Sequence, residues 1–561
     1  MKPSAYPPPV VPGEFIAKPS GDADSQLDVG VLFVGAGPAG LAGAIRLAQL
    51  LDEAPQVKEA LGEMPIVVVE KGRYPGAHLC SGAVVNPIAF KKLFPDTPPK
   101  DLPFFGPVED EAVYCLTESW AGRIPTPPTM ANHGNWIASL SQVGRWLGER
   151  AEELGVTILN ETVGGKLLVD EGVVRGVKVA DKGLDRDGKP LGNHEPGPDL
   201  MARVTVLAEG TVGHLTQAAL EQFRIARPSP QVYALGVKEV WEVPRPLDRV
   251  IHTMGWPLRP WARCHEFGGS FAYPMGKDKV SLGLVVGMDY TDAGLSVHDL
   301  LQELKLHPLF RDVLQGGQRA ERGWGAKTIP EGGYHSLPER MSVPGALIVG
   351  DAAGLVNVPS LKGVHTSMWS GILAAEAIFA RLKEGLDKAS STAIDGYDRA
   401  LQESFVAHEL REVRNMRQAF KHGFFVGGAL ACLMTLTRGR FPSGKIDIGQ
   451  DSDHDMEASG YTYKAADGKV TFDKLSSVHA SGNRSRDNQP NHIRVKIDVP
   501  ETLADTWIKM CPAEVYEWHE EGGKKVLFVN STNCIHCGAI NAKGGRLTMP
   551  EGGSGPEYTQ M

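Results

Sequence analysis

The sequence predicts an α/β fold class, α+β over the whole chain, and three observations support this prediction. A β-rich apolar run at 29–34 is followed at once by a glycine-rich turn and then by an alanine-rich apolar helix through residue 51. Three further short apolar runs, at 66–69, 204–208 and 346–349, are typical of buried strands. The end of the chain combines an alternating hairpin pattern with a cysteine pair. This order predicts a discontinuous Rossmann-like domain followed by a smaller C-terminal domain.

The turn at 35–40, Gly-Ala-Gly-Pro-Ala-Gly, predicts a dinucleotide site. Gly35 permits the tight turn, Gly37 lets backbone approach a pyrophosphate, and Gly40 lets the helix and strand pack closely. The N-terminus of the helix then faces the phosphates with unpaired N–H groups and the positive end of its dipole. The strand that follows ends in Glu70, an acid placed to bond a ribose hydroxyl.

Two further segments extend the expected cofactor site. The loop at 71–78 is glycine-rich and suited to fold over a bound cofactor, and Ser81-Gly82 continue it. After the last strand comes Gly350-Asp351-Ala352-Ala353-Gly354, where the acid is placed to bond the ribityl hydroxyls of FAD. Together with the first motif, this segment favours FAD over NAD. Because no second glycine fingerprint follows, we expect that the electrons do not come from NAD(P)H.

Composition narrows the function classes. A chain of 561 residues suggests three or four domains of about 150 residues each. Its net charge is −9 and it has no long basic run, so nucleic acid is not an expected partner. The seven cysteines are unevenly spread, which favours a reducing compartment over a secreted disulfide framework. Residues 1–27 are proline-rich without the apolar core of a signal peptide, and we expect a flexible arm.

A charge-free stretch at 423–437 lies between basic residues, namely Arg414, Arg417 and Lys421 before it and Arg438, Arg440 and Lys445 after it. As a helix it would be about 22 Å long, which is shorter than the roughly 30 Å of a bilayer's hydrocarbon core. A transmembrane span is therefore not expected. Two interpretations remain: a buried core helix, or a helix that dips into one leaflet with its basic flanks among the headgroups.

The cysteines near the C-terminus indicate a metal site. Cys511 precedes a proline, and Cys534 and Cys537 form a Cys-x-x-Cys pair, which is part of an iron–sulfur pattern. A further cysteine at the same spacing would fall at position 540. That residue is Ile540, and isoleucine cannot bind iron. An iron–sulfur cluster, a vacated site, and a zinc or redox dithiol site at Cys534 and Cys537 are all open interpretations.

Several longer stretches resemble the electron-transfer flavoprotein–ubiquinone oxidoreductase family, from about residue 27 to residue 561. They are GAGPAGLA, GAHLCSGA, NHGNWI, GWPL followed by GGSF, VNVPSLKGVHTSM with SGILAAEAIF, CPAEVYEW, NCIHC and PEGGSGPEY. The resemblance implies a peripheral membrane flavoprotein that passes electrons from electron-transfer flavoprotein, itself reduced by acyl-CoA and related dehydrogenases, to ubiquinone or menaquinone. The implied location is the cytoplasmic face of a prokaryotic inner membrane, or the matrix side of the inner mitochondrial membrane in a eukaryote.

The resemblance also implies a division into domains. The arm is 1–27, and the discontinuous FAD-binding domain comprises 28–106, 132–165, 200–230 and 335–400. The mixed β-sheet quinone-binding domain comprises 107–131, 166–199 and 231–334. A helical segment at 401–445 includes the membrane-dipping stretch 423–437, and residues 446–561 form a ferredoxin-like iron–sulfur domain.

Motifs and resemblance together define the expected sites. The expected FAD-binding residues are Gly35, Gly37, Pro38, Ala39, Gly40, Glu70, Lys71, Ala77, Ser81, Gly82, Gly350, Asp351, Gly354, Gly363, Val364, His365 and Thr366. His365 is assigned no acid–base role. By resemblance, Gly268 and Gly269 contact the quinone headgroup. The surrounding residues are apolar enough to line its channel, namely Trp256, Pro257, Trp261, Phe267 and Phe271. By resemblance, Cys511, Cys534 and Cys537 are cluster ligands.

One departure from the family pattern concerns the cluster. Ile540 stands at the family's fourth cysteine, and Asn541 stands at the acid that follows it. A [4Fe–4S] cluster, a [3Fe–4S] cluster, a substitute ligand such as Asn541, and loss of the cluster are therefore all open. Two other functions also remain: a flavin monooxygenase or prenyl reductase on the same fold, and a clusterless, non-catalytic paralogue that docks electron-transfer subunits at the membrane.

Overall fold

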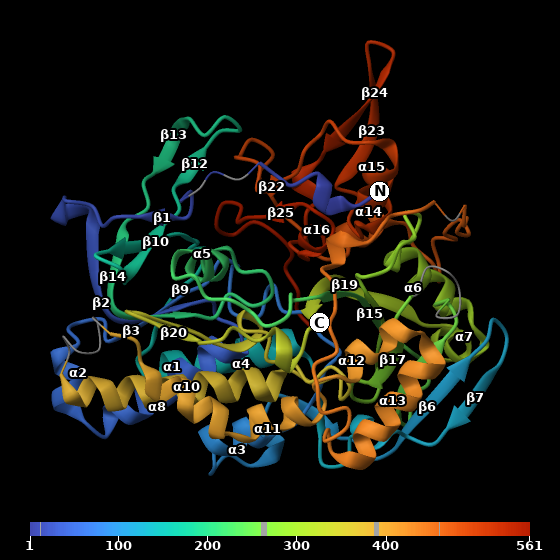
Figure 1. Cartoon of the computed structure of the whole chain (residues 1–561), viewed down its shortest axis with the longest axis horizontal. Helices are drawn as coiled ribbons and strands as arrows, with labels where there is room; N and C mark the ends of the chain where they lie inside the picture. Colours follow the sequence, from blue (N-terminus) through green and yellow to red (C-terminus); the bar gives the residue numbers. More distant parts are fainter. Residues whose placement is uncertain (10, 12, 260–265, 386–391, 459) are drawn as a thin grey trace.

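The computed structural model describes residues 1–561 except 10, 12, 260–265, 386–391 and 459. Figure 1 shows two large sheets lying beside each other, with the C-terminal segments in red at the top of the view. The α/β class predicted from the apolar runs is confirmed, and each large sheet has its own helices.

The first sheet holds the predicted dinucleotide strands. Its path is β1-β10-β11-β14-β2-β3-β9, and β21 and β20 join it through β14. In register, Val34 lies between Leu207 and Val69, and Leu207 also pairs with Ile348, so four parallel strands end at one edge. The bounds are β1 (Ile16–Ala17), β2 (Gln26–Val34), β3 (Ile66–Val69), β9 (Thr157–Leu159), β10 (Gly164–Asp170), β11 (Val173–Val179), β14 (Asp199–Leu207), β20 (Ser342–Val343) and β21 (Ala346–Ile348).

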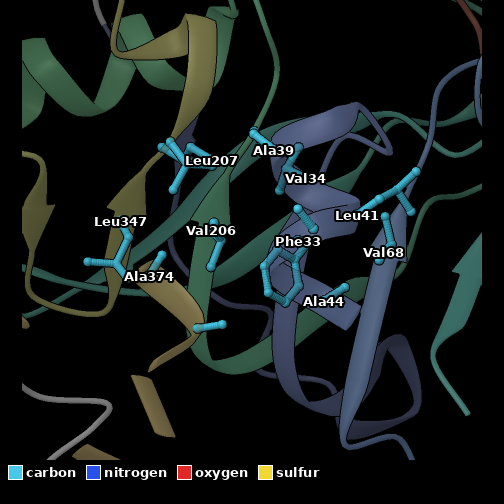
Figure 2. Packing of buried hydrophobic residues seen from close by; sticks show 14 of the residues in the cluster. Phe33, Val34, Ala39, Leu41, Ala44, Val68, Val206, Leu207, Leu347 and Ala374 are labelled. Atoms are coloured by element: carbon cyan, nitrogen blue, oxygen red, sulfur yellow. The ribbon is translucent and has the colours of Figure 1, made fainter. Parts of the chain in front are cut away.

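Two helices pack tightly against each other and against this sheet. Helix α1 (Pro38–Asp52) follows the glycine turn as predicted, and α8 (Val364–Glu384) packs on it. A Cβ atom at Gly371 of α8 would overlap the Ala39 carbonyl oxygen, so the backbones meet closely. Figure 2 shows Phe33 among the side chains of this core. The other helices around this sheet are α2 (Pro55–Ala60), α3 (Ile88–Leu93), α4 (Leu140–Glu153), α5 (His214–Gln222), α10 (Asp395–Glu403) and α11 (Phe405–Glu412).

Two expected domain assignments need correction. Strand β11 and most of β10 fall in 166–199, assigned above to the quinone-binding domain, but they extend the first sheet because β11 pairs antiparallel with β14. Only the hairpin β12 (Lys182–Leu184) and β13 (Pro190–Glu195) leaves that sheet. The expected flexible arm is attached at two points, since β1 pairs with β10 and the Met1 ammonium group lies 2.9 Å from Asp455.

The second sheet is mixed and runs in the order β19-β15-β18-β17-β16-β6-β7. Helices α6 (Val297–Leu306) and α7 (Pro308–Leu314) contribute to the same hydrophobic core. A small sheet of β4 (Val84–Val85), β8 (Trp136–Ala138) and β5 (Phe104–Pro107) lies in the connecting segments. The bounds of the large sheet are β6 (Glu111–Leu116), β7 (Ala121–Ile124), β15 (Tyr233–Glu242), β16 (Val250–Gly255), β17 (Gly268–Pro274), β18 (Lys279–Gly287) and β19 (Gln318–Pro330).

The C-terminal region shares its hydrophobic core with the second sheet, because Trp507 and Leu503 belong to the same cluster as Trp324. Its hairpin β23–β24 projects from the top of the molecule in Figure 1, and it is the alternating hairpin predicted between the cysteines. The elements are α14 (Lys474–His479), β22 (Ile493–Arg494), α15 (Glu501–Met510), β23 (Tyr516–Glu521), β24 (Lys524–Val529), α16 (Ala539–Ala542) and β25 (Arg546–Leu547).

The charge-free stretch forms helix α13 (Phe424–Thr437), preceded by α12 (Met416–Ala419). Phe425 is 78% exposed and Leu436 is 83% exposed, so α13 is not the buried core helix of the first interpretation. Among the helices that the structure describes, none combines the length and apolar character that a bilayer crossing requires.

Candidate functional site

The glycine turn has the geometry that its sequence predicts. Gly35 has a φ of +111°, and its N–H donates to the Val69 carbonyl oxygen at 2.9 Å. A Cβ atom at Gly40 would overlap the Gly35 carbonyl oxygen, so this glycine permits the close packing of helix and strand. By contrast, a Cβ atom at Gly37 would meet no protein atom within 4 Å, and Gly37 lines a cavity. The turn therefore offers backbone to a ligand.

Glu70 lies buried at the end of β3, beside this turn. One carboxylate oxygen accepts from the Ala36 N–H at 2.9 Å, and the other accepts from the Gly72 N–H at 2.7 Å. These two bonds fix the carboxylate at the edge where the parallel strands end. Each oxygen keeps a free lone pair, so the group can still accept from ribose hydroxyls.

Asp351 approaches the cavity from the end of β21. It lies in a short 3-10 turn, and the Ser367 hydroxyl donates to its carboxylate at 3.0 Å. Burial raises the pKa of Asp351, although the Ser367 bond and the charge of Lys327 oppose this rise. Helix α8 begins close by at Val364, after Gly363, and both residues line the cavity. An acid and a helix N-terminus thus face the same space.

A cavity of about 970 Å³ connects these elements. Gly37 and Glu70 line one part of it, Gly268 and Gly269 line another, and Leu436 of α13 lines a third. The cavity is therefore long enough to join the dinucleotide turn to the quinone residues and to the exposed helix. The predicted FAD-binding residues in its lining are Gly35, Gly37, Pro38, Ala39, Glu70, Lys71, Ser81, Gly82, Asp351, Gly363 and Val364.

The remaining predicted FAD-binding residues lie behind this lining and stay predictions. His365 is buried with its Nε2 3.2 Å from the Glu409 carboxylate, and the Thr366 hydroxyl donates to the Leu355 carbonyl oxygen at 2.5 Å. Both side chains thus bond protein groups. The other residues of this set are Gly40, Ala77, Gly350 and Gly354.

Strand β17 carries the predicted quinone residues. Gly268 has a φ of +152°, and a Cβ atom on it would overlap the Val285 carbonyl oxygen, whereas one on Gly269 would overlap the Thr253 carbonyl oxygen. Only glycine therefore fits here without displacing the neighbouring strands. Among the predicted channel residues, Phe267 and Phe271 line the cavity, Trp256 and Pro257 lie outside its lining, and Trp261 falls outside the described residues.

Arg417 was expected to flank the charge-free helix among lipid headgroups, but it is buried inside the protein. Only 6% of its side chain is exposed, and its guanidinium bonds Asp289 at 2.7 Å and Glu331 at 2.8 Å. The same group lies 4.1 Å from the centre of the Phe267 ring, next to the two quinone glycines. Because its partners are far apart in sequence, only the tertiary structure could identify this cavity residue.

Sequence reasoning also missed a polar pair on strands β16 and β17, formed by His252 and Tyr273. His252 of β16 faces Phe271 of β17 in register, and its Nε2 is 2.7 Å from the Tyr273 hydroxyl. Both His252 and Tyr273 line the cavity. Burial, with a smaller effect from the positive charge of Lys362, lowers the pKa of His252 to about 3, so the imidazole is neutral near pH 7.

The three predicted cysteine ligands lie together in the C-terminal region. Cys511 and Cys534 belong to one buried cluster, Cys537 packs against it, and none of the three forms a disulfide. Burial raises the pKa of all three thiols, to about 12 at Cys537. Such thiols ionise when a metal compensates their charge. Ile540, in the fourth position, is buried in the same apolar cluster, so the residues present do not fit a cluster held by four thiolates.

Strand β19 links the cysteine site to the cavity. Lys327 and Thr328 both line the cavity. The Thr328 N–H donates to the Cys537 carbonyl oxygen at 2.9 Å, and the Lys327 ammonium donates to the His536 carbonyl oxygen at 2.9 Å. The Cys-x-x-Cys segment is therefore separated from the cavity by only one strand.

Comparison with known proteins identifies relatives for most of the chain. Residues 233–329 match the family described as ETF-QO, ubiquinone-binding, and residues 468–559 match electron transfer flavoprotein-ubiquinone oxidoreductase, 4Fe-4S. The mitochondrial electron transfer flavoprotein-ubiquinone oxidoreductase of Dictyostelium discoideum is 40% identical over 97% of this chain and 92% of its own length. That of Homo sapiens is 38% identical over 95% of this chain and 89% of its own length.

Solved structures share the fold at low identity. A geranylgeranyl bacteriochlorophyll reductase-like protein from Thermoplasma acidophilum has a TM-score of 0.55 at 15% identity, covering 74% of this chain and 92% of that one. A flavin-dependent brominase variant has a TM-score of 0.50 at 16% identity, covering 73% and 94%. At these identities the likeness shows a common fold alone.

Proposed function

Since the chain belongs to the electron transfer flavoprotein–ubiquinone oxidoreductase family, we propose that it takes electrons from reduced electron transfer flavoprotein and delivers them through FAD to a quinone. The observation that carries this proposal is the single cavity of about 970 Å³, which is lined by the dinucleotide turn, by the two glycines of β17 and by helix α13. One continuous cavity with these lining residues can hold a flavin close to a quinone.

The residues that would hold FAD follow from the geometry. Gly37 would contact the pyrophosphate, Glu70 would accept from the ribose, and Asp351 would accept from the ribityl chain. Bound there, FAD supplies the electron chemistry, and the protein orients the ring and keeps water out. Lys71 lines the same space, and burial lowers its pKa to about 8, so it adds positive charge near the cofactor at neutral pH.

The quinone site would use backbone and apolar surface. Gly268 and Gly269 leave room for a flat headgroup against the strand, and Phe267 and Phe271 line the approach. Arg417, itself fixed by two ion pairs, packs against the Phe267 ring. Ubiquinone and menaquinone share the quinone ring that this surface would bind, so both are proposed acceptors.

Helix α13 would place the cavity at a membrane. Its exposed apolar residues include Phe425 and Leu436, and Leu436 also lines the cavity. Exposed basic residues flank the helix at Lys421, Arg438 and Arg440, which suits anionic headgroups. We place the protein peripherally on the cytoplasmic face of a prokaryotic inner membrane, or on the matrix side of the inner mitochondrial membrane in a eukaryote.

Quinone reduction with reduced electron transfer flavoprotein as the sole donor tests the function. The FAD-loaded protein should reduce a short-chain ubiquinone or menaquinone analogue catalytically. Gly269→Val should lower this activity at least tenfold while FAD stays bound, because its side chain would displace the Thr253 backbone. Gly192→Val, on the exposed strand β13 where a Cβ meets no atom within 4 Å, is the matched control. Rapid flavin reduction by NADPH with no quinone reduction would instead favour a monooxygenase or prenyl reductase.

A further inference from the structure

The cysteine site offers three thiolates where a four-thiolate site has four, and this number determines which iron–sulfur cluster fits. We propose that it holds a three-iron cluster, [3Fe–4S], bound by Cys511, Cys534 and Cys537, with the side chain of Ile540 closing the corner where a fourth iron would need a ligand. This inference concerns the cluster alone, and it does not depend on which donor or quinone the protein uses.

Three cysteines can each supply one thiolate. Cys511 ends α15, Cys534 follows the 3-10 turn at 531–533, and Cys537 precedes α16, so each comes from the end of a different element. All three are free thiols in or against one apolar cluster. Iron–sulfur clusters are held by thiolates in such a setting, with one cysteine for each ligated iron.

The fourth corner is apolar and dry. Ile540 is 4% exposed, and it packs so closely against Gly545 that a Cβ atom there would overlap its side chain. A fourth iron at this corner would lack a protein ligand, and the buried position gives water or hydroxide little access. A metal cation with an open coordination position in apolar surroundings is strongly disfavoured. Loss of that one iron leaves a cluster whose three irons are all ligated.

The adjacent polar side chain is already engaged. The Asn541 Oδ1 accepts from the Leu547 N–H at 3.0 Å, which ties α16 to β25. Recruiting this amide to iron would break that bond and leave a backbone N–H without its partner. Asn541 is therefore a poor substitute for the missing thiolate.

Two imidazoles are the other nearby donors. The rings of His492 and His536 are buried without hydrogen-bond partners, and each offers a nitrogen within 4.8 Å of the Cys534 Sγ. His536 packs edge-on against His78, which lines the cavity, with ring centres 5.4 Å apart. These rings thus gather at Cys534 on the side toward the cavity, whereas the Ile540 side chain packs against Gly545. An imidazole ligand is the main competing outcome.

The test is metal content and low-temperature EPR on the full-length protein, reconstituted anaerobically with ferrous iron and sulfide. A three-iron cluster is paramagnetic when oxidised and has integer spin after one-electron reduction, whereas a four-iron cluster is diamagnetic when oxidised and paramagnetic with half-integer spin when reduced. We expect about three irons per FAD and the three-iron pattern. A four-iron pattern, or less than about one iron per FAD, would overturn the proposal.

Substitutions at the fourth corner make the test specific. Ile540→Cys should raise the content to about four irons per FAD and reverse the EPR pattern, while Ile540→Val should keep three. If the unsubstituted protein held four irons and His492→Ala or His536→Ala reduced this to three, an imidazole would be the fourth ligand and the proposal would be wrong. These readouts require no turnover, so they stand apart from any failure of the proposed electron transfer.

Discussion

The buried carboxylate of Glu70 bonds two backbone segments and also lines the cavity where FAD is proposed to bind. Its two oxygens accept from the Ala36 and Gly72 N–H groups, one in the glycine turn and one in the following loop. The residue therefore sets the relative position of the two segments that enclose the adenosine end of the proposed FAD.

Glu70→Gln should weaken FAD binding about tenfold, which corresponds to about 1.4 kcal/mol. The amide has only one accepting oxygen, so either Ala36 or Gly72 would face an NH₂ group instead of an acceptor. Titration of the apoprotein with FAD, followed by flavin fluorescence, measures the change. Glu59→Gln, at an exposed position on α2, is the control and should leave affinity unaltered. Equal affinity in the Glu70 variant would refute the assigned role.

His252 makes stability depend on pH in a defined direction. Burial holds the pKa of the folded-state imidazole near 3, whereas an unfolded histidine titrates near 6.5. Between these values the unfolded chain binds a proton that the folded chain does not bind, so acid favours unfolding. Above about pH 6.5 both states are neutral at this position, and the effect vanishes.

His252→Gln should make the free energy of unfolding fall less steeply as the pH is lowered. The native protein should lose about 1.4 kcal/mol more per pH unit than the variant as pH falls below about 6.5. Glutamine can still bond the Tyr273 hydroxyl, so the comparison isolates the titration. Urea unfolding at several pH values measures it, with the exposed His133→Gln as control. Parallel curves for the native protein and the His252 variant would show that this imidazole does not titrate as stated.

At the scale of the element, α13 is unusual because it is apolar on exposed as well as packed positions. Met434 and Gly427 face the protein, while Phe425, Val426 and Leu436 are exposed. Phe424, next to them, lines the cavity instead. A test of membrane binding should therefore change the exposed positions and leave Phe424 intact.

Phe425→Glu combined with Val426→Glu should reduce binding to anionic phospholipid vesicles by roughly a hundredfold, since each apolar side chain contributes about 1.5–3 kcal/mol when buried in lipid. Vesicle co-sedimentation measures the binding. Leu475→Glu, a similarly exposed leucine on α14, should bind like the native protein. Undiminished sedimentation of the double variant would rule out α13 as the membrane contact.

At the scale of the whole molecule, a buried ion pair joins α6 to the second sheet at the point where Phe472 of the C-terminal region packs. Lys305 of α6 lies 2.8 Å from Glu239 of β15, and both side chains are fully buried. The Lys305 ammonium also lies 5.1 Å from the centre of the Phe472 ring, and the Phe472 N–H donates to Gln302 of α6. The charge of Lys305 keeps the pKa of Glu239 below its usual value despite burial.

Lys305→Met should destabilise the protein by about 3–5 kcal/mol, because it leaves the Glu239 carboxylate buried without its closest cation. Adding Glu239→Gln should recover much of this loss, since the neutral amide can still accept from the Trp241 indole N–H. Thermal unfolding measures both variants. Lys525→Met removes the exposed contact with Glu501 and should change stability by less than about 1 kcal/mol. A small effect of Lys305→Met would contradict this account.

Much of the site could be predicted from local pattern. The runs ending at Val34 and Val69 are short and apolar, and Gly35 after the first run has a φ that other residues rarely adopt, so strand, turn and acid follow from the sequence. Cys511, Cys534 and Cys537 were recognisable in the same way. Arg417 was not, because a basic residue before an apolar helix has the same local pattern whether it meets lipid or two buried carboxylates.

The sequence by itself therefore determined the dinucleotide turn, the order of the main elements and the absence of a thiol at position 540. Only the tertiary structure decided that β10 and β11 extend the first sheet, that α13 exposes its apolar side chains, and that one cavity joins Glu70, Gly269 and Leu436. The physical reason is the sequence separation between the residues that decide each feature. Turns and strand patterns depend on neighbouring residues, whereas sheet membership, burial of a charge and the shape of a cavity depend on contacts between segments hundreds of residues apart.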